Sequence, residues 1–469
     1  MRMQQLLDGV EVLRLRGNPA RTEITSISHD SRKVTTGTLF CCLRGARVDG
    51  HDFAPAAVAA GASALLCERE LPLDVPQAVV GDSRAAAGPA AAAFFGHPSR
   101  RMTLVGVTGT NGKTTTAHLV KAVLEADGRK TGVIGTLSGR RTTPEAIDLQ
   151  MQLASMIDDG STAAAIEVSS HALVQHRVGG TWFAVVAFTN LSPEHLDYHE
   201  SMEAYFEAKS LLFRPEYAAL AVVNGDDPWG RRLIESARIP TTSFSLAEVE
   251  DLDLGPTSSS FTWRGQAVTL QLGGMFNVQN AVSAAAIGST LGVDERTVAA
   301  GLAAAPPVPG RFQTVEARQP FLVIVDYAHT PASLEQLLQS ARHYTTGRVI
   351  TVFGCGGDRD RIKRPAMGAV ATRLSDLAFL TSDNPRHEDP GAIIDEVRAG
   401  VERPEVLVVE PDRRAAIAAA LAAACDGDVV VLAGKGHETV QVVGDEELDF
   451  DDRVVALEEL AALSGAGGW

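Results

Sequence analysis

The chain has 469 residues, of which 45% are hydrophobic, 21% charged and 5% aromatic, and its formal net charge is −16. This length predicts about three domains, each able to bury a core. The acidic balance and the few aromatic residues disfavour a nucleic-acid-binding surface, although they are compatible with a local phosphate site. The five cysteines have no Cys-x-x-Cys spacing, which disfavours a disulfide framework or a zinc ribbon.

The N-terminal segment, which begins Met-Arg-Met-Gln-Gln, lacks the apolar core of a signal peptide. Uninterrupted apolar runs also fall short of the roughly 20 residues that a membrane helix needs. We therefore predict a cytoplasmic protein that binds neither a membrane nor a nucleic acid.

Two breaks divide the chain. Segment 96–101, Gly-His-Pro-Ser-Arg-Arg, ends an alanine-rich helix, and segment 305–310, Ala-Pro-Pro-Val-Pro-Gly, is a stiff connector. These breaks predict domains at 1–100, 101–308 and 309–469. In the second and third domains short apolar strands alternate with helical segments, which predicts parallel sheets with helices on both faces. The strand candidates are 102–107, 163–168, 183–188, 220–223, 321–325, 349–353, 377–380 and 429–432.

The glycine-rich segment 106–116, Gly-Val-Thr-Gly-Thr-Asn-Gly-Lys-Thr-Thr-Thr, lies between a short apolar strand and a segment with helical spacing. Such a turn aims backbone N–H groups and the helix N-terminus at an anion. Lys113 is placed to reach the outer phosphates of a nucleotide, and the Thr114 hydroxyl to hold Mg²⁺. The usual spacing would put a glycine at Val107, so the segment predicts a variant phosphate-binding loop.

Three further positions stand out in the second domain. Glu167 ends a strand beyond the phosphate loop, where a carboxylate suits Mg²⁺, although a surface glutamate has the same pattern. His195 lies in the polar segment 190–199, which indicates a second cation site, a substrate loop or an ordinary solvated loop. Lys209 is flanked by apolar residues at helical spacing, and a buried neutral lysine can react with CO₂ to form a carbamate. On the sequence alone, a lysine whose stem packs while its head stays in water is the favoured interpretation.

Four polar segments of the third domain each follow an apolar strand. Because ligands of open α/β sheets bind at the carboxyl ends of strands, we expect the four segments to share one site. Asp326 is placed to take ribose hydroxyls, and Arg311 to approach the phosphate that is transferred. The segments are 326–331 (Asp-Tyr-Ala-His-Thr-Pro), 354–360 (Gly-Cys-Gly-Gly-Asp-Arg-Asp), 383–386 (Asp-Asn-Pro-Arg) and 434–438 (Gly-Lys-Gly-His-Glu).

Taken together, these segments resemble the Mur ligases of bacterial peptidoglycan synthesis, in order and over nearly the whole chain, and most of all the members that add the third residue of the stem peptide. The resemblance implies an α/β fold with a small N-terminal α/β domain, a central P-loop-type ATPase domain with a parallel sheet, and a C-terminal Rossmann-like domain. It implies an ATP-dependent, ADP-forming ligase that converts the D-glutamate side-chain carboxylate to an acyl phosphate before an amine attacks. It is carried by 109–115, 167–171 (Glu-Val-Ser-Ser-His), His195, Lys209, Asn277, Asn280, 326–329 and 434–438.

The resemblance also assigns residues to each substrate. Ser31 and Arg47 would hold the uridine diphosphate end of a UDP-muramoyl-dipeptide. The implied dipeptide contacts are Thr142, Thr143, Ser169, Gln175 and Arg177, and the implied ATP contacts are Gly109, Thr110, Asn111, Gly112, Lys113, Thr114, Thr115, Asn277, Asn280 and Asp326. The implied catalytic residues are Lys113, Glu167, His195, Lys209 and Arg311, and the implied Mg²⁺ ligands are Thr114, Glu167, His195 and Lys209 as a carbamate.

Segment 383–386 indicates meso-diaminopimelate as the incoming amino acid. A guanidinium pairs with a carboxylate through two parallel hydrogen bonds, so Arg386, with Arg359, would bind the distal carboxylate. Asp383, Gly434 and Glu438 would meet the distal ammonium. Lysine has no distal carboxylate and would leave Arg386 unpaired, at a cost of roughly a few kcal/mol. The implied amino-acid-binding residues are Arg359, Asp383, Asn384, Pro385, Arg386, Gly434 and Glu438.

Other functions stay open on this sequence. The amino acid could be lysine or ornithine, and a P-loop nucleotide switch is an alternative of a different class. A folylpolyglutamate synthetase shares the phosphate loop and the C-terminal domain, but it would not need the domain that contains Ser31. For the ligase we expect small-molecule substrates, Mg²⁺ as the metal and a monomeric protein.

Overall fold

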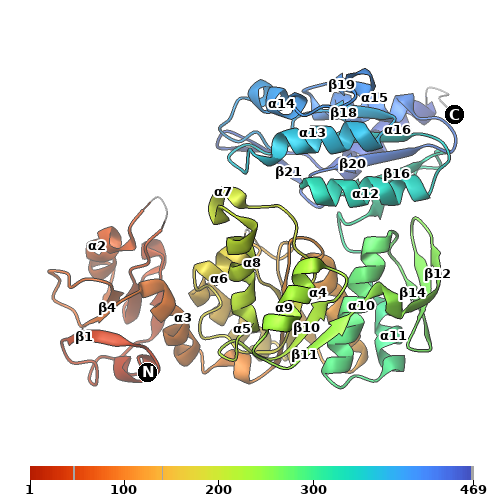
Figure 1. The fold of residues 1–469 in the computed structure, drawn as a ribbon. Helices are drawn as coiled ribbons and strands as arrows, with labels where there is room; N and C mark the ends of the chain where they lie inside the picture. The colour runs from red at the N-terminus through yellow and green to blue at the C-terminus, as the bar shows by residue number, and fades with distance from the viewer. Residues whose placement is uncertain (46–47, 140, 466–469) are drawn as a thin grey trace.

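The computed structural model describes residues 1–45, 48–139 and 141–465, which form N-terminal, central and C-terminal regions, each with its own main sheet. Figure 1 shows the N-terminal region, in red, beside the central region, and the C-terminal region, in blue, above it. In the described part of the chain no helix is both long and apolar enough to cross a membrane. Short 3-10 helices connect larger elements at η1 (Ser31–Lys33), η2 (Gly50–Phe53), η3 (Pro98–Arg100), η4 (Leu211–Phe213), η5 (Leu246–Glu248) and η6 (Pro404–Val406).

The N-terminal sheet has the strand order β1-β5-β4-β3-β2, and β1 runs antiparallel to β5 while the other neighbours are parallel. A side chain at Gly88 would collide with the carbonyl oxygen of Gly179, so this glycine lets the alanine-rich helix α3 pack directly against the central region. The elements are β1 (Val12–Arg16), β2 (Ser26–Ser28), β3 (Thr38–Cys41), β4 (Ala62–Cys67), β5 (Gln77–Val80), α1 (Met3–Leu6), α2 (Ala54–Ala59) and α3 (Ser83–Phe94).

The central sheet is entirely parallel, in the order β11-β10-β9-β6-β8-β7, and apolar clusters cover both of its faces. Its strands are β6 (Thr103–Thr108), β7 (Thr131–Ile134), β8 (Ala163–Glu167), β9 (Phe183–Phe188), β10 (Ala218–Asn224) and β11 (Thr241–Phe244). Its helices are α4 (Lys113–Ala126), α5 (Ala146–Asp158), α6 (Ser170–Val174), α7 (Leu196–His199), α8 (Met202–Ser210), α9 (Pro228–Ser236), α10 (Met275–Thr290) and α11 (Glu295–Ala304).

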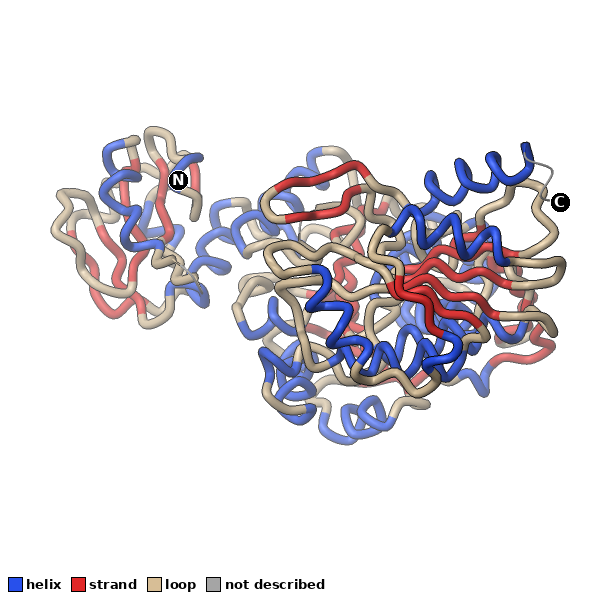
Figure 2. The backbone as a smooth tube through the Cα atoms, turned by 90° about the horizontal axis from the view of Figure 1, so that it is seen from above, coloured by secondary structure: helices blue, strands red, loops and turns tan. Residues whose placement is uncertain are grey.

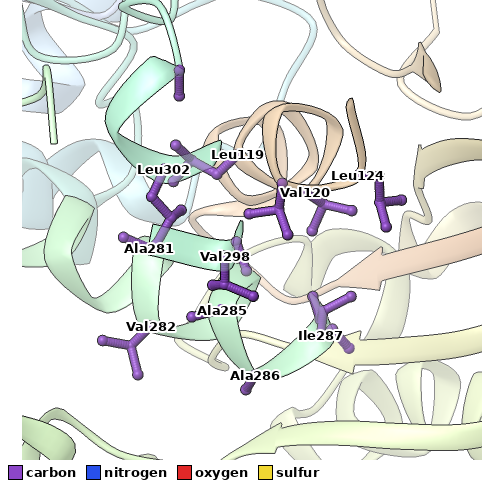
Figure 3. Close-up of a cluster of buried hydrophobic side chains, with 14 of the residues drawn as sticks. Leu119, Val120, Leu124, Ala281, Val282, Ala285, Ala286, Ile287, Val298 and Leu302 are labelled. Carbon is purple, nitrogen blue, oxygen red and sulfur yellow. The ribbon is translucent and has the colours of Figure 1, made fainter. Parts of the chain in front are cut away.

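One of these clusters fixes helix α4, which follows the phosphate loop. Figure 3 shows Leu119 and Val120 of α4 near Ala281 and Ala285 of α10 and the side chain of Leu302 on α11. A Cβ at Gly301 would lie 2.6 Å from the Val123 Cα, so glycine allows the backbones of α11 and α4 to approach closely. The phosphate loop is therefore followed by a helix, α4, that packs against α10 and α11.

A second, antiparallel sheet in the central region departs from the predicted parallel architecture. Its order is β12 (Val249–Leu254), β13 (Ser259–Trp263) and β14 (Gln266–Leu270). The side chains of β13 alternate between buried and half-buried, and Arg264 and Gly265 both have positive φ in a two-residue hairpin turn. The strands are short and mixed in polarity, so a search for apolar strands does not find them.

The C-terminal sheet has the order β15-β16-β20-β17-β18-β19, and β15 runs antiparallel to β16 while the other neighbours are parallel. Figure 2 shows its strands side by side with helices on both faces. The elements are β15 (Gln313–Thr314), β16 (Leu322–Asp326), β17 (Val349–Phe353), β18 (Leu377–Leu380), β19 (Leu407–Val409), β20 (Val429–Ala433), the hairpin β21 (Val440–Val443) and β22 (Glu446–Asp449), and α12 (Pro331–His343), α13 (Lys363–Leu374), α14 (Pro390–Arg398), α15 (Arg413–Ala423) and α16 (Asp452–Gly465). The eight predicted strands are confirmed, with small shifts at their ends.

Candidate active site

A cavity of about 790 Å³ lies between the central and C-terminal regions, at the carboxyl ends of the parallel strands of both main sheets. Many of the residues singled out in the sequence line it. From the central region and the linker these are Thr110, Asn111, Gly112, Lys113, Thr114, Thr115, Thr142, Thr143, Glu167, Ser169, Arg177, His195, Asn280 and Arg311. From the C-terminal region they are Asp326, Arg359, Asp383, Asn384, Arg386, Gly434 and Glu438.

Several predicted residues lie outside this described lining. These are Gly109, Gln175, Lys209, Asn277 and Pro385. Ser31 is in η1 of the N-terminal region. Arg47, predicted to hold the uridine diphosphate end, lies outside the described residues.

The phosphate loop depends on glycine at two positions. Gly109 has φ +149 and Gly112 has φ +84, both in the region that side-chain-bearing residues rarely adopt. A Cβ at either position would also collide, with the Thr189 hydroxyl and the Asn280 side chain respectively. The loop thus turns sharply from β6 into α4, with its backbone toward the cavity.

Lys113 closes over this loop. Its Nζ donates hydrogen bonds to the carbonyl oxygens of Gly109, at 2.8 Å, and Thr110, at 2.6 Å. Burial lowers the pKa of Lys113, while the carboxylates of Glu194 and Glu167 favour its charged form. The ammonium is therefore held at the mouth of the loop, where an anion would meet it.

Buried oxygen atoms gather next to Lys113. The Thr114 hydroxyl donates to Glu167 Oε2 at 2.9 Å, and Thr136 donates to both Glu167 oxygens through its N–H, at 2.8 Å, and its hydroxyl, at 3.1 Å. Arg311 reaches across from the linker, with Nη2 3.0 Å from the Thr114 hydroxyl. Hydroxyl and carboxylate oxygens are the ligands that Mg²⁺ prefers, and the guanidinium adds a positive charge beside them.

Glu194 is a functional candidate that the sequence reasoning missed. Its side chain is 7% exposed, and its carboxylate lies 3.8 Å from His195 Nε2 and 3.2 Å from His329 Nε2. Burial opposes its ionisation, but the hydrogen bond from His329 and the charge of Lys113 hold its pKa well below the usual value. In the sequence, its position next to His195 in the polar segment 190–199 is the pattern that could have indicated a functional role. The contact with His329 links the central and C-terminal regions.

Two histidines near this point are kept neutral. Burial lowers the pKa of His195 to about 3, although Glu194 opposes the shift, and it lowers the pKa of His199 to about 4. His199 Nε2 lies 2.9 Å from the Ser170 hydroxyl. His195 adopts φ +57, a left-handed conformation that turns the chain into α7.

Lys209 is buried, contrary to the favoured interpretation of the sequence. Its side chain lies on α8, and Nζ donates to the Gly109 carbonyl oxygen at 2.9 Å and lies 4.6 Å from the centroid of the Tyr205 ring. Burial, together with the charge of Lys113, lowers the pKa of Lys209 well below its usual value. Such an environment favours the neutral amine that carbamate formation requires.

The two asparagines of α10 support the loop from below. Asn277 is fully buried and donates to the Gly273 carbonyl oxygen at 2.8 Å. Asn280 Nδ2 donates to Asn277 Oδ1 at 3.3 Å, and its own Oδ1 faces Gly112. Asn280 lines the cavity, while Asn277 fixes it from behind.

Asp326 ends strand β16 and is held by backbone N–H groups. Phe312 N–H donates to Oδ2 at 2.7 Å and Ala328 N–H donates to Oδ1 at 2.8 Å. Burial raises the pKa of Asp326, and the charge of Arg311 opposes that shift. The guanidinium of Arg311 also lies 4.6 Å from the Tyr327 ring centroid, so the linker arginine is fixed from both sides.

The loops of the C-terminal region converge on Arg386. This residue adopts φ +52, its Nη1 donates to the Gly357 carbonyl oxygen at 2.8 Å, and its backbone N–H donates to the Val442 carbonyl oxygen at 3.0 Å. Burial and the charge of Arg359 lower the pKa of Arg386, while Asp383 and Glu438 oppose that shift. A substrate carboxylate that binds this guanidinium would offset the cost of burying its charge.

Lys435 fixes these loops from inside the protein and was not among the predicted site residues. Its side chain is fully buried, and Nζ lies 3.3 Å from Asn384 Oδ1, 3.3 Å from Glu438 Oε2 and 2.5 Å from the Val440 carbonyl oxygen. Asn384 Nδ2 also donates to Glu438 Oε2 at 2.7 Å. Its place in the segment Gly-Lys-Gly-His-Glu was a signal, but the burial that gives it this role is a tertiary property.

Three family models match in succession: "Mur ligase family, catalytic domain" over 23–105, "Mur ligase middle domain" over 107–288 and "Mur ligase, glutamate ligase domain" over 310–436. A UDP-N-acetylmuramoyl-L-alanyl-D-glutamate--2,6-diaminopimelate ligase of Geobacillus kaustophilus is 46% identical over 470 residues, which cover 94% of this chain and 95% of the relative. The protein of the same name from Streptomyces avermitilis is 46% identical over 475 residues, covering 94% of each. A solved structure with that ligase name is 33% identical, covers 99% of both chains and has a TM-score of 0.69.

Proposed function

The chain belongs to the Mur ligase family, and from this premise we propose that it adds meso-2,6-diaminopimelate to the D-glutamate γ-carboxylate of UDP-N-acetylmuramoyl-L-alanyl-D-glutamate, with ATP as the energy source, in peptidoglycan biosynthesis. The observation that carries the proposal is a single cavity with the phosphate loop on one wall and the Arg386 loops on the other. A nucleotide and an amino acid can thus meet at one substrate carboxylate.

The first step brings two anions together. The γ-carboxylate of the dipeptide attacks the γ-phosphorus of ATP, the bond to ADP breaks, and an acyl phosphate forms. Lys113 and Arg311 are the cations whose side chains flank the phosphate loop, and they would offset the repulsion between carboxylate and triphosphate. The amine of diaminopimelate then attacks the carbonyl carbon, loses a proton, and phosphate leaves.

Mg²⁺ fits the oxygens beside Lys113. The Thr114 hydroxyl and the Glu167 carboxylate are both buried and share one wall of the cavity. We assign the ion to these two residues with His195, and we assign to Lys209 a carbamate that supports a magnesium ion. When bound, Mg²⁺ supplies positive charge that neutralises the phosphate oxygens.

Contacts between the two walls support a state that excludes water. Arg311 bonds to Thr114, Glu194 pairs with His329, and the Tyr344 hydroxyl accepts the Gly274 N–H at 2.8 Å. An acyl phosphate hydrolyses when water reaches it, so closure around it protects the intermediate. Because both walls come from one chain, we also propose that the protein acts as a monomer. We propose a cytoplasmic location as well, as expected from the sequence.

A product assay tests the proposal. The protein is offered ATP, the UDP-linked dipeptide and diaminopimelate, lysine or ornithine, and the products are weighed by mass spectrometry. We expect the diaminopimelate adduct to dominate and ADP to form only when both the dipeptide and an amino acid are present. ADP release without the dipeptide would favour a nucleotide switch, and a dominant lysine or ornithine adduct would contradict the role given to Arg386.

A further inference from the structure

Three arginines surround one buried carboxylate where the N-terminal region meets the central one. Glu145 is 8% exposed and directly precedes α5. Arg84 Nη1 lies 2.9 Å from Glu145 Oε2, Arg177 Nε lies 3.2 Å from Oε1, and Arg141 Nη1 also pairs with Oε1. We call these four residues the Glu145 cluster.

The cluster joins parts of the chain that are far apart in sequence. Arg84 belongs to α3 of the N-terminal region, and its Nε donates to the Arg44 carbonyl oxygen at 2.8 Å. Arg177 belongs to the central region, and its Nη1 donates to the Thr143 carbonyl oxygen at 3.3 Å. Glu145 therefore connects a loop of the N-terminal region to a wall of the cavity.

Thr143 in turn contacts the end of strand β8, where Glu167 lies. The Thr143 hydroxyl donates to the Glu167 carbonyl oxygen at 2.8 Å and accepts the Ser169 N–H at 3.0 Å. Thr143, Ser169 and Arg177 all line the cavity. A shift of Glu145 would thus be felt at the cavity wall assigned to the dipeptide.

The charge balance makes Glu145 hard to replace. Three guanidiniums and one carboxylate leave a surplus of two positive charges. Burial opposes the ionised form of Glu145, but Arg177, Arg84 and Arg141 together hold its pKa below the usual value. The Glu145 carboxylate also makes no cap hydrogen bond to α5. Removing its charge would leave three arginines that repel one another with one of them only 13% exposed.

We propose that Glu145 is a positioning residue that locks the N-terminal region onto the central region and orients Arg177 for the UDP-linked dipeptide. This inference rests on the proposed function for the identity of the substrate, but the lock itself does not depend on it. Glu145 acts through arginines, so it need not touch the substrate. Its loss should weaken the grip on the UDP-linked substrate and leave the nucleotide end of the cavity intact.

Kinetics of Glu145→Gln test the positioning role. We expect KM for the UDP-linked dipeptide to rise about tenfold, with KM for ATP and kcat within about twofold of the wild type. Asp428→Asn is the matched control, because Asp428 is also a buried carboxylate paired with an arginine, Arg348 at 2.7 Å, but lies outside the cavity lining. An unchanged KM for the dipeptide, or an equal loss for ATP, overturns the proposal.

A double variant tests whether Glu145 acts through Arg84. Arg84→Met removes the bridge from the N-terminal side, where the side chain is 21% exposed and the change is mild. If both residues serve one lock, Glu145→Gln combined with Arg84→Met raises KM for the dipeptide no further than the stronger single change. Effects that multiply would show that the two residues act independently and would contradict the lock.

Hydrogen exchange gives a readout that needs neither substrate nor turnover. In Glu145→Gln and in Arg84→Met we expect faster amide exchange in 41–45 and 83–88, with the phosphate loop unchanged. Asp428→Asn should leave both segments as in the wild type. Unchanged exchange in both variants refutes the lock even if the ligase reaction is confirmed, whereas faster exchange in a protein without ligase activity would refute only the proposed function.

Discussion

The two walls of the cavity are built in different ways, and each contains a buried lysine. On the central wall, a single stretch of chain, 109–115, makes the phosphate loop, and the Lys209 amine behind it donates to one backbone carbonyl. In the described part of the chain no carboxylate lies within ion-pair distance of Lys209. On the opposite wall, four separate loops line the cavity, and Lys435 joins two of them through Asn384 and Glu438.

This difference separates a chemical role from a structural one. A buried amine without an acidic partner is pushed toward its neutral, reactive form. A buried ammonium that faces a carboxylate and two carbonyl or amide oxygens instead holds its neighbours in place. Substitutions on the central wall are therefore expected to lower the catalytic rate. Substitutions on the opposite wall are expected to weaken amino-acid binding and to lower the free energy of unfolding.

The largest effect is expected at Lys113. Lys113→Ala removes the ammonium beside the phosphate loop, so ADP formation should fall by at least about 10³-fold because transition-state charge is no longer neutralised. Coupled ADP release measures this. Lys121→Ala on the same helix is the control, since Lys121 pairs with Glu125 away from the cavity. Retained turnover in Lys113→Ala would mean that the phosphate loop is assigned wrongly.

Lys209 tests whether the buried lysine of the central wall has a chemical role. Lys209→Ala should lower kcat by about 10²-fold, because the proposed carbamate cannot form while the fold survives removal of a single hydrogen bond. Added acetate or formate should restore part of the rate by supplying a carboxylate. Activity that is unaffected, or a loss that small acids do not change while thermal unfolding stays normal, would return Lys209 to a packing role.

Arg386 tests recognition on the second wall. Arg386→Ala should raise KM for diaminopimelate by about 10²-fold, which corresponds to about 2.7 kcal/mol, and leave KM for ATP nearly unchanged. Arg386→Lys keeps the charge without the two-pronged geometry and should be intermediate. Steady-state kinetics with each substrate varied in turn measure both values. An unchanged KM for the amino acid would exclude the proposed contact.

Lys435 should show a mixed effect of moderate size. Lys435→Met leaves Glu438 without its buried partner, so we expect about a tenfold rise in KM for diaminopimelate together with a loss of a few kcal/mol in the free energy of unfolding. Denaturant unfolding and kinetics on the same samples measure the two effects. A variant that is as stable as the wild type but inactive would show that Lys435 acts chemically, which would contradict its structural role.

The smallest expected effect is a pH dependence of stability at His199. The folded state lowers the pKa of His199 from 6.5 to about 4 because the ring is buried. The unfolded chain therefore binds a proton first, and stability falls as the pH drops from about 6.5 to about 4. His199→Gln should flatten this part of the curve of unfolding free energy against pH. A slope equal to that of the wild type would contradict the lowered pKa of His199.

The features that the sequence predicted best are local in the chain. The phosphate loop is one contiguous segment whose glycines and lysine act locally, so its residues could be named and the structure brings Thr110 to Thr115 to one cavity. The apolar strands were likewise found from local patterns. The antiparallel sheet β12–β14 was missed because its strands are short and polar.

Residues whose importance comes from distant partners could not be found in this way. Glu145, Glu194 and Lys435 are ordinary charged residues in the sequence, and only the fold buries them against arginines, histidines or a carboxylate. The burial of Lys209 was misjudged for the same reason, because helical spacing does not tell how deeply an amphipathic side chain is covered.

The most direct test of the account follows one oxygen atom. The UDP-linked dipeptide is prepared with ¹⁸O in its D-glutamate γ-carboxylate and is ligated to diaminopimelate with unlabelled ATP. If the carboxylate attacks the γ-phosphorus, each phosphate released from labelled substrate carries one ¹⁸O, which mass spectrometry detects. Phosphate without label, formed alongside the amide product, would contradict activation through an acyl phosphate.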